Sequence, residues 1–134
     1  MTPDAAPPPP PLDPRSLAGR LRALALDFPE ATEDFPWGER ALKVRGKAFL
    51  FLRAEGGVTS FSVKLPRSAA DALELPGTEP TGYGLGKHGW VTVRADAGRD
   101  APLETYAAWL EESYAAVAPK RLAAQRAAAR PPAD

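Results

Sequence analysis

Apolar and polar positions alternate most regularly in the middle of the chain, between Glu39 and Leu65. Glycine-containing breaks at residues 45–47 and 55–57 divide this stretch into three runs, and short breaks of that kind are typical of antiparallel hairpins. We therefore expect a three-stranded meander. Its second run, residues 47–54, is apolar on both sides and should be the most buried of the three.

The alternation also assigns side chains to the two faces of this sheet, because strand side chains point to opposite faces in turn. One set of positions is apolar: Leu42, Val44, Phe61, Val63, Leu65, Val91 and Val93. The other set is mostly polar: Lys43, Arg45, Ser60, Ser62, Lys64, Trp90, Thr92 and Arg94. We expect the first set to contact helices and the second to face water, as in an antiparallel sheet with one covered face.

Helical spacing of apolar residues predicts helices before and after these strands. Asp13 is expected to cap a first helix over about residues 14–27, and Ser68 to cap a short helix over residues 69–75. The longest helix is expected to begin at Pro102. The order is then helix, three strands, short helix, one or two strands and long helix.

Two segments between these elements are interpreted as loops. Residues 30–38 carry large apolar groups, and residues 78–89 are rich in glycine, with room for one short strand near Tyr83. Helices gathered on one face of an antiparallel sheet make a two-layer α+β domain. We therefore predict that fold class, with four or five strands.

The two ends of the chain differ in composition from this domain. Residues 1–12 contain six prolines and little surface to bury, so we expect a disordered leader. A single domain is expected over residues 13–120, followed by an Ala/Arg/Pro-rich tail over 121–134. There is no cysteine, and no apolar run approaches the roughly 18 residues that cross a bilayer, which predicts a cytoplasmic protein.

Charge changes this picture only locally, because 17 basic residues balance 17 acidic ones. Residues 40–94 nevertheless hold nine basic and four acidic side chains, and several of the basic ones fall on the expected wet face. Cations and hydroxyls on such a face can contact phosphates, and an aromatic ring can stack on a base. The expected nucleic-acid-binding residues are Lys43, Arg45, Lys47, Lys64, Arg67, Trp90 and Arg94.

Two other interpretations of the same residues stay open. Lys, Arg, Ser and Thr commonly cover exposed sheet surfaces for solubility, and edge lysines oppose aggregation. Alternatively, the chain is a protein-interaction or chaperone-like module, in which an exposed sheet face or a helix engages a partner and the Pro-rich leader acts as a tether.

The sequence gives little support for a catalytic, metal or cofactor site. No nucleophile–base pair, metal site or cofactor loop can be assembled from residue types and spacing, so neither an enzyme nor a bound cofactor is expected. His88 is the only histidine and is interpreted as an ordinary loop residue. Four acidic residues fit no calcium-binding spacing and are interpreted as a solvated loop: Glu30, Glu33, Asp34 and Glu39.

Several segments, taken in order, resemble the MmcQ/YjbR family. They are Asp34–Gly38, Lys43–Phe49, Ser62–Lys64, Tyr83 ahead of Gly89–Val93, and Ser113–Tyr114. The positions that match the family pattern are Trp37, Lys47, Phe49, Lys64, Trp90 and Ser113, within a resemblance over about residues 14–120. The resemblance implies a bacterial protein with an α/β fold likened to type III secretion chaperones and to frataxin-like CyaY, and with a DNA-binding function.

Overall fold

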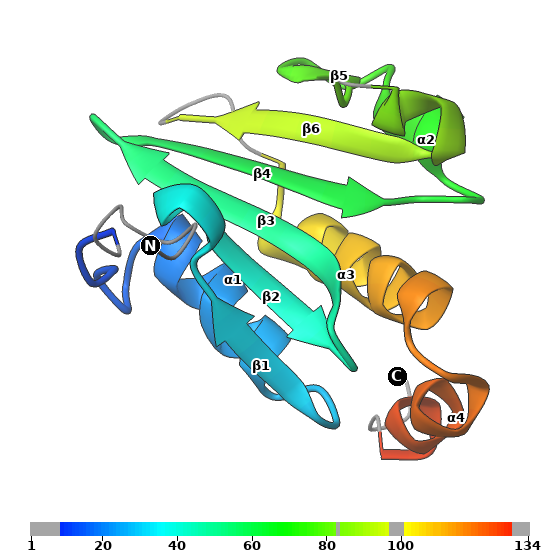
Figure 1. The fold of residues 1–134 in the computed structure, drawn as a ribbon. Helices are drawn as coiled ribbons and strands as arrows, with labels where there is room; N and C mark the ends of the chain where they lie inside the picture. The colour runs from blue at the N-terminus through cyan, green and yellow to red at the C-terminus, as the bar shows by residue number, and fades with distance from the viewer. Residues whose placement is uncertain (1–8, 83, 97–100, 130–134) are drawn as a thin grey trace.

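The computed structural model describes residues 9–82, 84–96 and 101–129. Six antiparallel strands form one sheet in the order β1-β2-β3-β4-β6-β5 (Figure 1). The strands are β1 (Ala31–Asp34), β2 (Arg40–Val44), β3 (Lys47–Glu55), β4 (Val58–Lys64), β5 (Thr78–Pro80) and β6 (Trp90–Ala95). The helices are α1 (Leu17–Leu26), α2 (Ala69–Ala72), α3 (Leu103–Val117) and α4 (Lys120–Ala129), with 3-10 turns η1 (Pro36–Gly38) and η2 (Leu85–His88).

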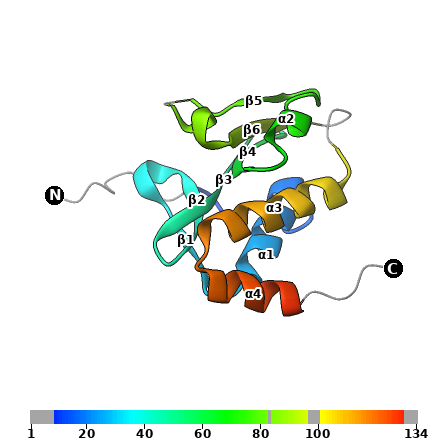
Figure 2. The same ribbon diagram turned by 90° about the vertical axis from the view of Figure 1, so that its right-hand side faces the viewer.

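Helices α1 and α3 pack on the same side of the sheet, which we call the covered face (Figures 1 and 2). The opposite side is called the uncovered face. This arrangement confirms the predicted two-layer α+β class and the three-stranded meander, but the sheet has six strands and not the four or five predicted. No helix in the described residues is long and apolar enough to span a bilayer.

Tight turns fix the register of the meander. Arg45 and Gly46 join β2 to β3 with φ of 52° and 80°, and Gly56 and Gly57 join β3 to β4 with φ of 59° and 82°. Two positive φ values in a two-residue turn match the right-handed twist of the strands that it connects. The three strands therefore form without a long connection.

The prediction of a loop over residues 30–38 is wrong, because the segment contains strand β1. Ala31–Asp34 pairs with β2, from Ala31 opposite Val44 to Asp34 opposite Ala41. The strand is polar, and its place in the sheet depends on partners that the local pattern does not reveal. The short strand expected near Tyr83 lies at Thr78–Pro80, whereas Tyr83 itself is outside the described residues.

The second run is also less buried than expected. The pairing of β2 with β3 shifts between Leu42 and Lys43, which leaves Phe49 as an extra residue on β3. This β-bulge lets both Phe49 and Leu50 enter the core. Because the far end of β3 is exposed, β2 rather than β3 is the more buried strand.

Two helix caps differ from the expectation. Ser16, not Asp13, caps α1, because its Oγ accepts a hydrogen bond from the backbone N–H of Gly19 at 3.0 Å. The hydroxyl of Ser68 makes no capping bond to α2 and donates instead to Oε1 of Glu112 at 2.6 Å. The Glu112 carboxylate of α3 thus accepts the hydrogen bonds of the groups that precede α2.

The core lies between the covered face and the helices. Phe28, Phe49 and Tyr114 form an aromatic cluster with ring centroids 4.8–5.6 Å apart. Helix α4 closes one side: Leu122 is buried, and the guanidinium of Arg126 lies 4.5 Å from the ring centroid of Phe28. Residues 121–129, expected as part of the tail, therefore belong to a packed helix.

Candidate nucleic-acid interface

The uncovered face presents side chains in rows across the central strands. Phe51 on β3 lies opposite Ser62 on β4, which lies opposite Thr92 on β6. A second row consists of Arg53, Ser60 and Arg94, and a third pairs Lys64 with Trp90. The face assignment made from alternation is confirmed for β4 and β6, because their apolar partners Phe61, Val63, Val91 and Val93 are buried on the covered face.

A chain of hydroxyl groups crosses this face. The Oγ of Ser62 lies 2.8 Å from Oγ1 of Thr92, and Oγ1 of Thr92 lies 2.9 Å from Oγ1 of Thr81. In each pair either oxygen can be the donor. Each hydroxyl has one donor and two acceptor sites, so the chain keeps hydrogen-bonding capacity for a ligand.

An aromatic pair lies beside the hydroxyls. The rings of Phe51 and Trp90 are tilted by 47° with centroids 5.6 Å apart. Trp90 is 8% exposed, whereas Phe51 is half-buried. Phe51 is consequently the ring that a ligand can reach, and Trp90 supports it. Phe51 escaped the sequence analysis because its run is apolar on both sides.

A shallow hollow of about 180 Å³ lies over the centre of the uncovered face. Its wall combines the aromatic ring, the hydroxyls and one ion pair, from Phe51, Ser60, Ser62, Thr92, Arg53 and Glu39. Nη2 of Arg53 lies 3.6 Å from Oε1 of Glu39 across the rim. The hollow can therefore take a small polar and aromatic group.

The expected cations divide into paired and unpaired residues. Lys43 donates to Oδ2 of Asp34 at 2.8 Å, and Arg45 donates to Oε1 of Glu30 at 2.6 Å. Arg67 is largely exposed and lies 4.0 Å from Oε1 of Glu112. The remaining three cations, whose side chains have no partner among residues 9–82, 84–96 and 101–129, are Lys47, Lys64 and Arg94.

Lys43 and Arg45 have their partners on or near β1. The four acidic residues interpreted as a solvated loop all bind basic side chains: Glu30, Glu33, Asp34 and Glu39. The hydrogen bond from Arg45 holds the pKa of Glu30 below its ordinary value, and that from Lys43 does the same for Asp34. Recognising residues 31–34 as a strand antiparallel to β2 would have revealed these pairs.

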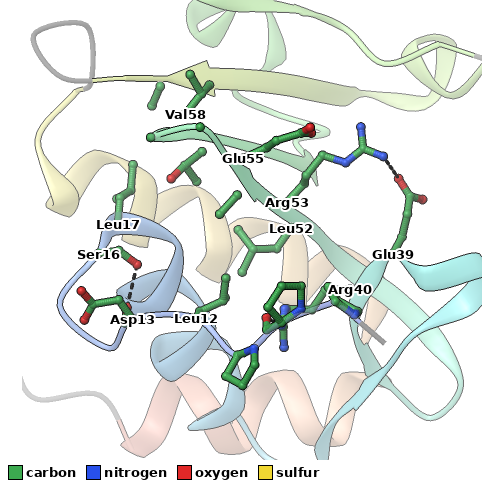
Figure 3. A pocket seen from close by; sticks show the side chains of 18 of the residues that line it. Leu12, Asp13, Ser16, Leu17, Glu39, Arg40, Leu52, Arg53, Glu55 and Val58 are labelled. Atoms are coloured by element: carbon green, nitrogen blue, oxygen red, sulfur yellow. Dashed lines mark hydrogen bonds and ion pairs between the residues drawn. The ribbon is translucent and has the colours of Figure 1, made fainter. Parts of the chain in front are cut away.

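A larger cavity lies elsewhere, at the end of the sheet between the β3–β4 hairpin and residues 9–17 (Figure 3). It measures about 690 Å³ and has an apolar wall that includes Leu12, Leu17, Leu52 and Val58. Arg40, 5% exposed, donates to Oε2 of Glu33 at 2.6 Å and to the carbonyl oxygen of Pro10 at 3.0 Å. Its buried guanidinium is thus already used within the molecule.

Comparison with known proteins shows which family this architecture represents. The family model YjbR matches residues 26–116, more than half of the chain. The chain belongs to the YjbR family. No match was found among curated proteins.

A solved structure supports the fold of this YjbR-family chain. The crystal structure of the Deinococcus radiodurans protein DR2400, described by the family-model domain DUF419, matches with a TM-score of 0.63 at 22% identity. The match covers 76% of this chain and 78% of that one. At this identity, the similarity establishes the fold alone.

Positions that carried the YjbR resemblance lie on both sides of the sheet. Ser113 of α3 is fully buried: its Oγ accepts from the backbone N–H of Lys64 at 2.9 Å and donates to the carbonyl oxygen of Phe49 at 2.6 Å. This hydroxyl bridges β3 and β4 directly behind Lys64. Lys47 and Lys64 lie at the same end of the sheet, whereas the side chain of Trp37 is outside the described residues.

Proposed function

We propose that this YjbR-family protein binds DNA through the uncovered face of its sheet. One observation carries the proposal: Lys64 and Arg94 have no side-chain partner among the described residues and flank the hydroxyl chain and Phe51. Cations without an internal partner can neutralise phosphates and release counterions without first breaking an ion pair.

The spacing of these two cations suits a polymer of phosphates. Lys64 is opposite Trp90, and Arg94 follows Trp90 by four positions on β6. At about 3.3 Å per strand residue, the two side chains arise about 13 Å apart along the strands. Successive phosphates of a B-DNA strand rise by only 3.4 Å or so along its axis, so the two cations are far enough apart to contact different phosphates.

The decisive experiment measures fluorescence anisotropy of a labelled oligonucleotide at low salt. We expect Lys64→Glu and Arg94→Glu each to weaken binding at least tenfold and to lower the slope of log affinity against log salt by about one. Arg20→Glu is the matched control, because Arg20 is an exposed cation of α1, on the covered side of the sheet. Absence of binding at tens of micromolar protein, or equal losses in all three variants, would contradict the proposal.

A further inference from the structure

We infer that the uncovered face binds single-stranded DNA and stacks one unpaired base on Phe51. This inference rests on the proposed function and specifies its substrate. It starts from Phe51, which lies in the middle of the sheet and is held by the Trp90 ring 5.6 Å away. A half-buried ring that is already ordered loses little freedom when a base stacks on it.

The hollow next to this ring is small and shallow, with a volume of about 180 Å³. A single base that stacks on Phe51 would lie over it. The hydroxyls of Ser60, Ser62 and Thr92 line the hollow, where they can bond to the edge of the base.

Duplex DNA cannot offer a base to this position. Both faces of each base in a duplex are covered by its neighbours, whereas an unpaired base can leave the stack and present its ring face to an aromatic side chain. In a duplex, Lys64 and Arg94 could contact phosphates or base edges, but no base could stack on Phe51. We therefore expect single-stranded DNA to bind more tightly than duplex DNA, because only an unpaired base can stack on Phe51 and contact the hollow.

The same site should accept bases of different identity. A hydroxyl both donates and accepts hydrogen bonds, so the Ser62–Thr92 pair can reverse its direction to suit the base. Stacking on Phe51 likewise does not depend on the identity of the base, because every base has an aromatic face. We expect preference for single strands over duplexes without strong sequence preference.

The test compares one oligonucleotide, free and annealed to its complement, against the full chain and variants of Phe51. Wild type should bind the single strand at least tenfold more tightly than the duplex. Phe51→Leu, which keeps apolar bulk and removes the aromatic face, should weaken single-strand binding about tenfold and leave duplex binding unchanged. Phe51→Trp should retain the single-strand preference. Thermal unfolding would verify that each variant folds.

The outcomes separate this inference from the proposed function. Equal binding of both DNA forms, or an unaltered single-strand affinity in a folded Phe51→Leu variant, overturns the inference. In that case, sensitivity to Lys64→Glu and Arg94→Glu would still support DNA binding by the face. If neither form of DNA binds the wild type, the proposed function fails, and the inference fails with it.

Discussion

The covered and uncovered faces of the sheet use polar groups in different ways. Behind the sheet, the polar side chains of Ser113, Glu112 and Arg40 bind partners within the molecule. No buried side-chain nitrogen or oxygen in the described part of the chain lacks a hydrogen bond. On the uncovered face, the side chains of Lys64 and Arg94 have no partner among the described residues. The difference indicates that polar groups of the covered face stabilise the fold, while Lys64 and Arg94 on the uncovered face are available to a ligand.

The largest expected effect on stability is that of Ser113→Ala. The substitution removes the fully buried hydroxyl that hydrogen-bonds both the amide of Lys64 and the carbonyl of Phe49. We expect the free energy of unfolding to fall by about 2–4 kcal/mol, since each unsatisfied buried group costs about 1–3 kcal/mol. Urea unfolding followed by circular dichroism measures this change.

Thr105→Ala on the same helix is the control for that substitution. The Thr105 side chain makes no hydrogen bond within the described residues, so its removal should change stability by about 0.5 kcal/mol or less. Equal effects of the two variants would mean that the Ser113 bridge contributes little.

A smaller effect is expected for Glu112→Ala. The Glu112 carboxylate accepts hydrogen bonds from the backbone amides of Arg67 and Ser68, at 2.8 and 3.0 Å, and from the Ser68 hydroxyl. We expect a loss of about 1–3 kcal/mol, because water can reach part of this site. Glu104→Ala, at an exposed position in the first turn of α3, should stay within about 0.5 kcal/mol in the same unfolding measurement.

Two carboxylates on the covered side of the sheet, Glu33 and Glu112, should make the free energy of unfolding depend on pH. The hydrogen bond from Arg22, opposed by burial and aided by Arg40, holds the pKa of Glu33 below its ordinary value. In Glu112, burial would raise the pKa, but the hydrogen bonds from Ser68 and two backbone amides outweigh it and lower the pKa. Both carboxylates therefore bind protons more readily in the unfolded chain.

Their contribution to stability is present above the ordinary glutamate pKa of about 4.3 and is lost as pH falls through the lowered folded-state values. We expect the unfolding free energy to decline below about pH 5, with a maximum slope near 1.4 kcal/mol per pH unit for each such proton. Glu33→Gln should make the slope shallower than in wild type. Urea titrations between pH 7 and pH 3 test this, and parallel curves would contradict it.

The smallest effects on stability belong to the uncovered face. Lys64→Ala and Arg94→Ala should each change the unfolding free energy by about 0.5 kcal/mol or less, because neither side chain has a partner to lose among the described residues. A destabilisation above about 1.5 kcal/mol in either variant would show that this face is structural. The contrast between the two faces would then disappear.

The sequence predicted those elements whose side chains repeat with a clear period. The alternation in β4 and β6 was sufficient for the fold class and for the two faces, and the apolar stripe of α3 was sufficient for that helix. Strand β1 was missed because Ala-Thr-Glu-Asp carries too few apolar residues to indicate a strand. Its position depends on pairing with β2, which local pattern does not encode.

The same limit applies to the candidate interface. The sequence places four cations on the same face: Lys43, Arg45, Lys64 and Arg94. It does not reveal that Lys43 and Arg45 bind carboxylates, whereas Lys64 and Arg94 have no partner among the described residues. That division follows from the register of β1 on β2. Likewise, the bond between Ser113 and Phe49 joins residues 64 positions apart, so only the folded chain reveals it.

The extra residue in β3 decides the fate of two identical side chains. Phe49 and Phe51 are two positions apart and would share a face in a regular strand. The bulge sends Phe49 to the cluster with Phe28 and Tyr114, while Phe51 remains in front beside Trp90. One inserted residue thus places the first phenylalanine in the core and leaves the second on the uncovered face, so two side chains of the same kind meet opposite requirements.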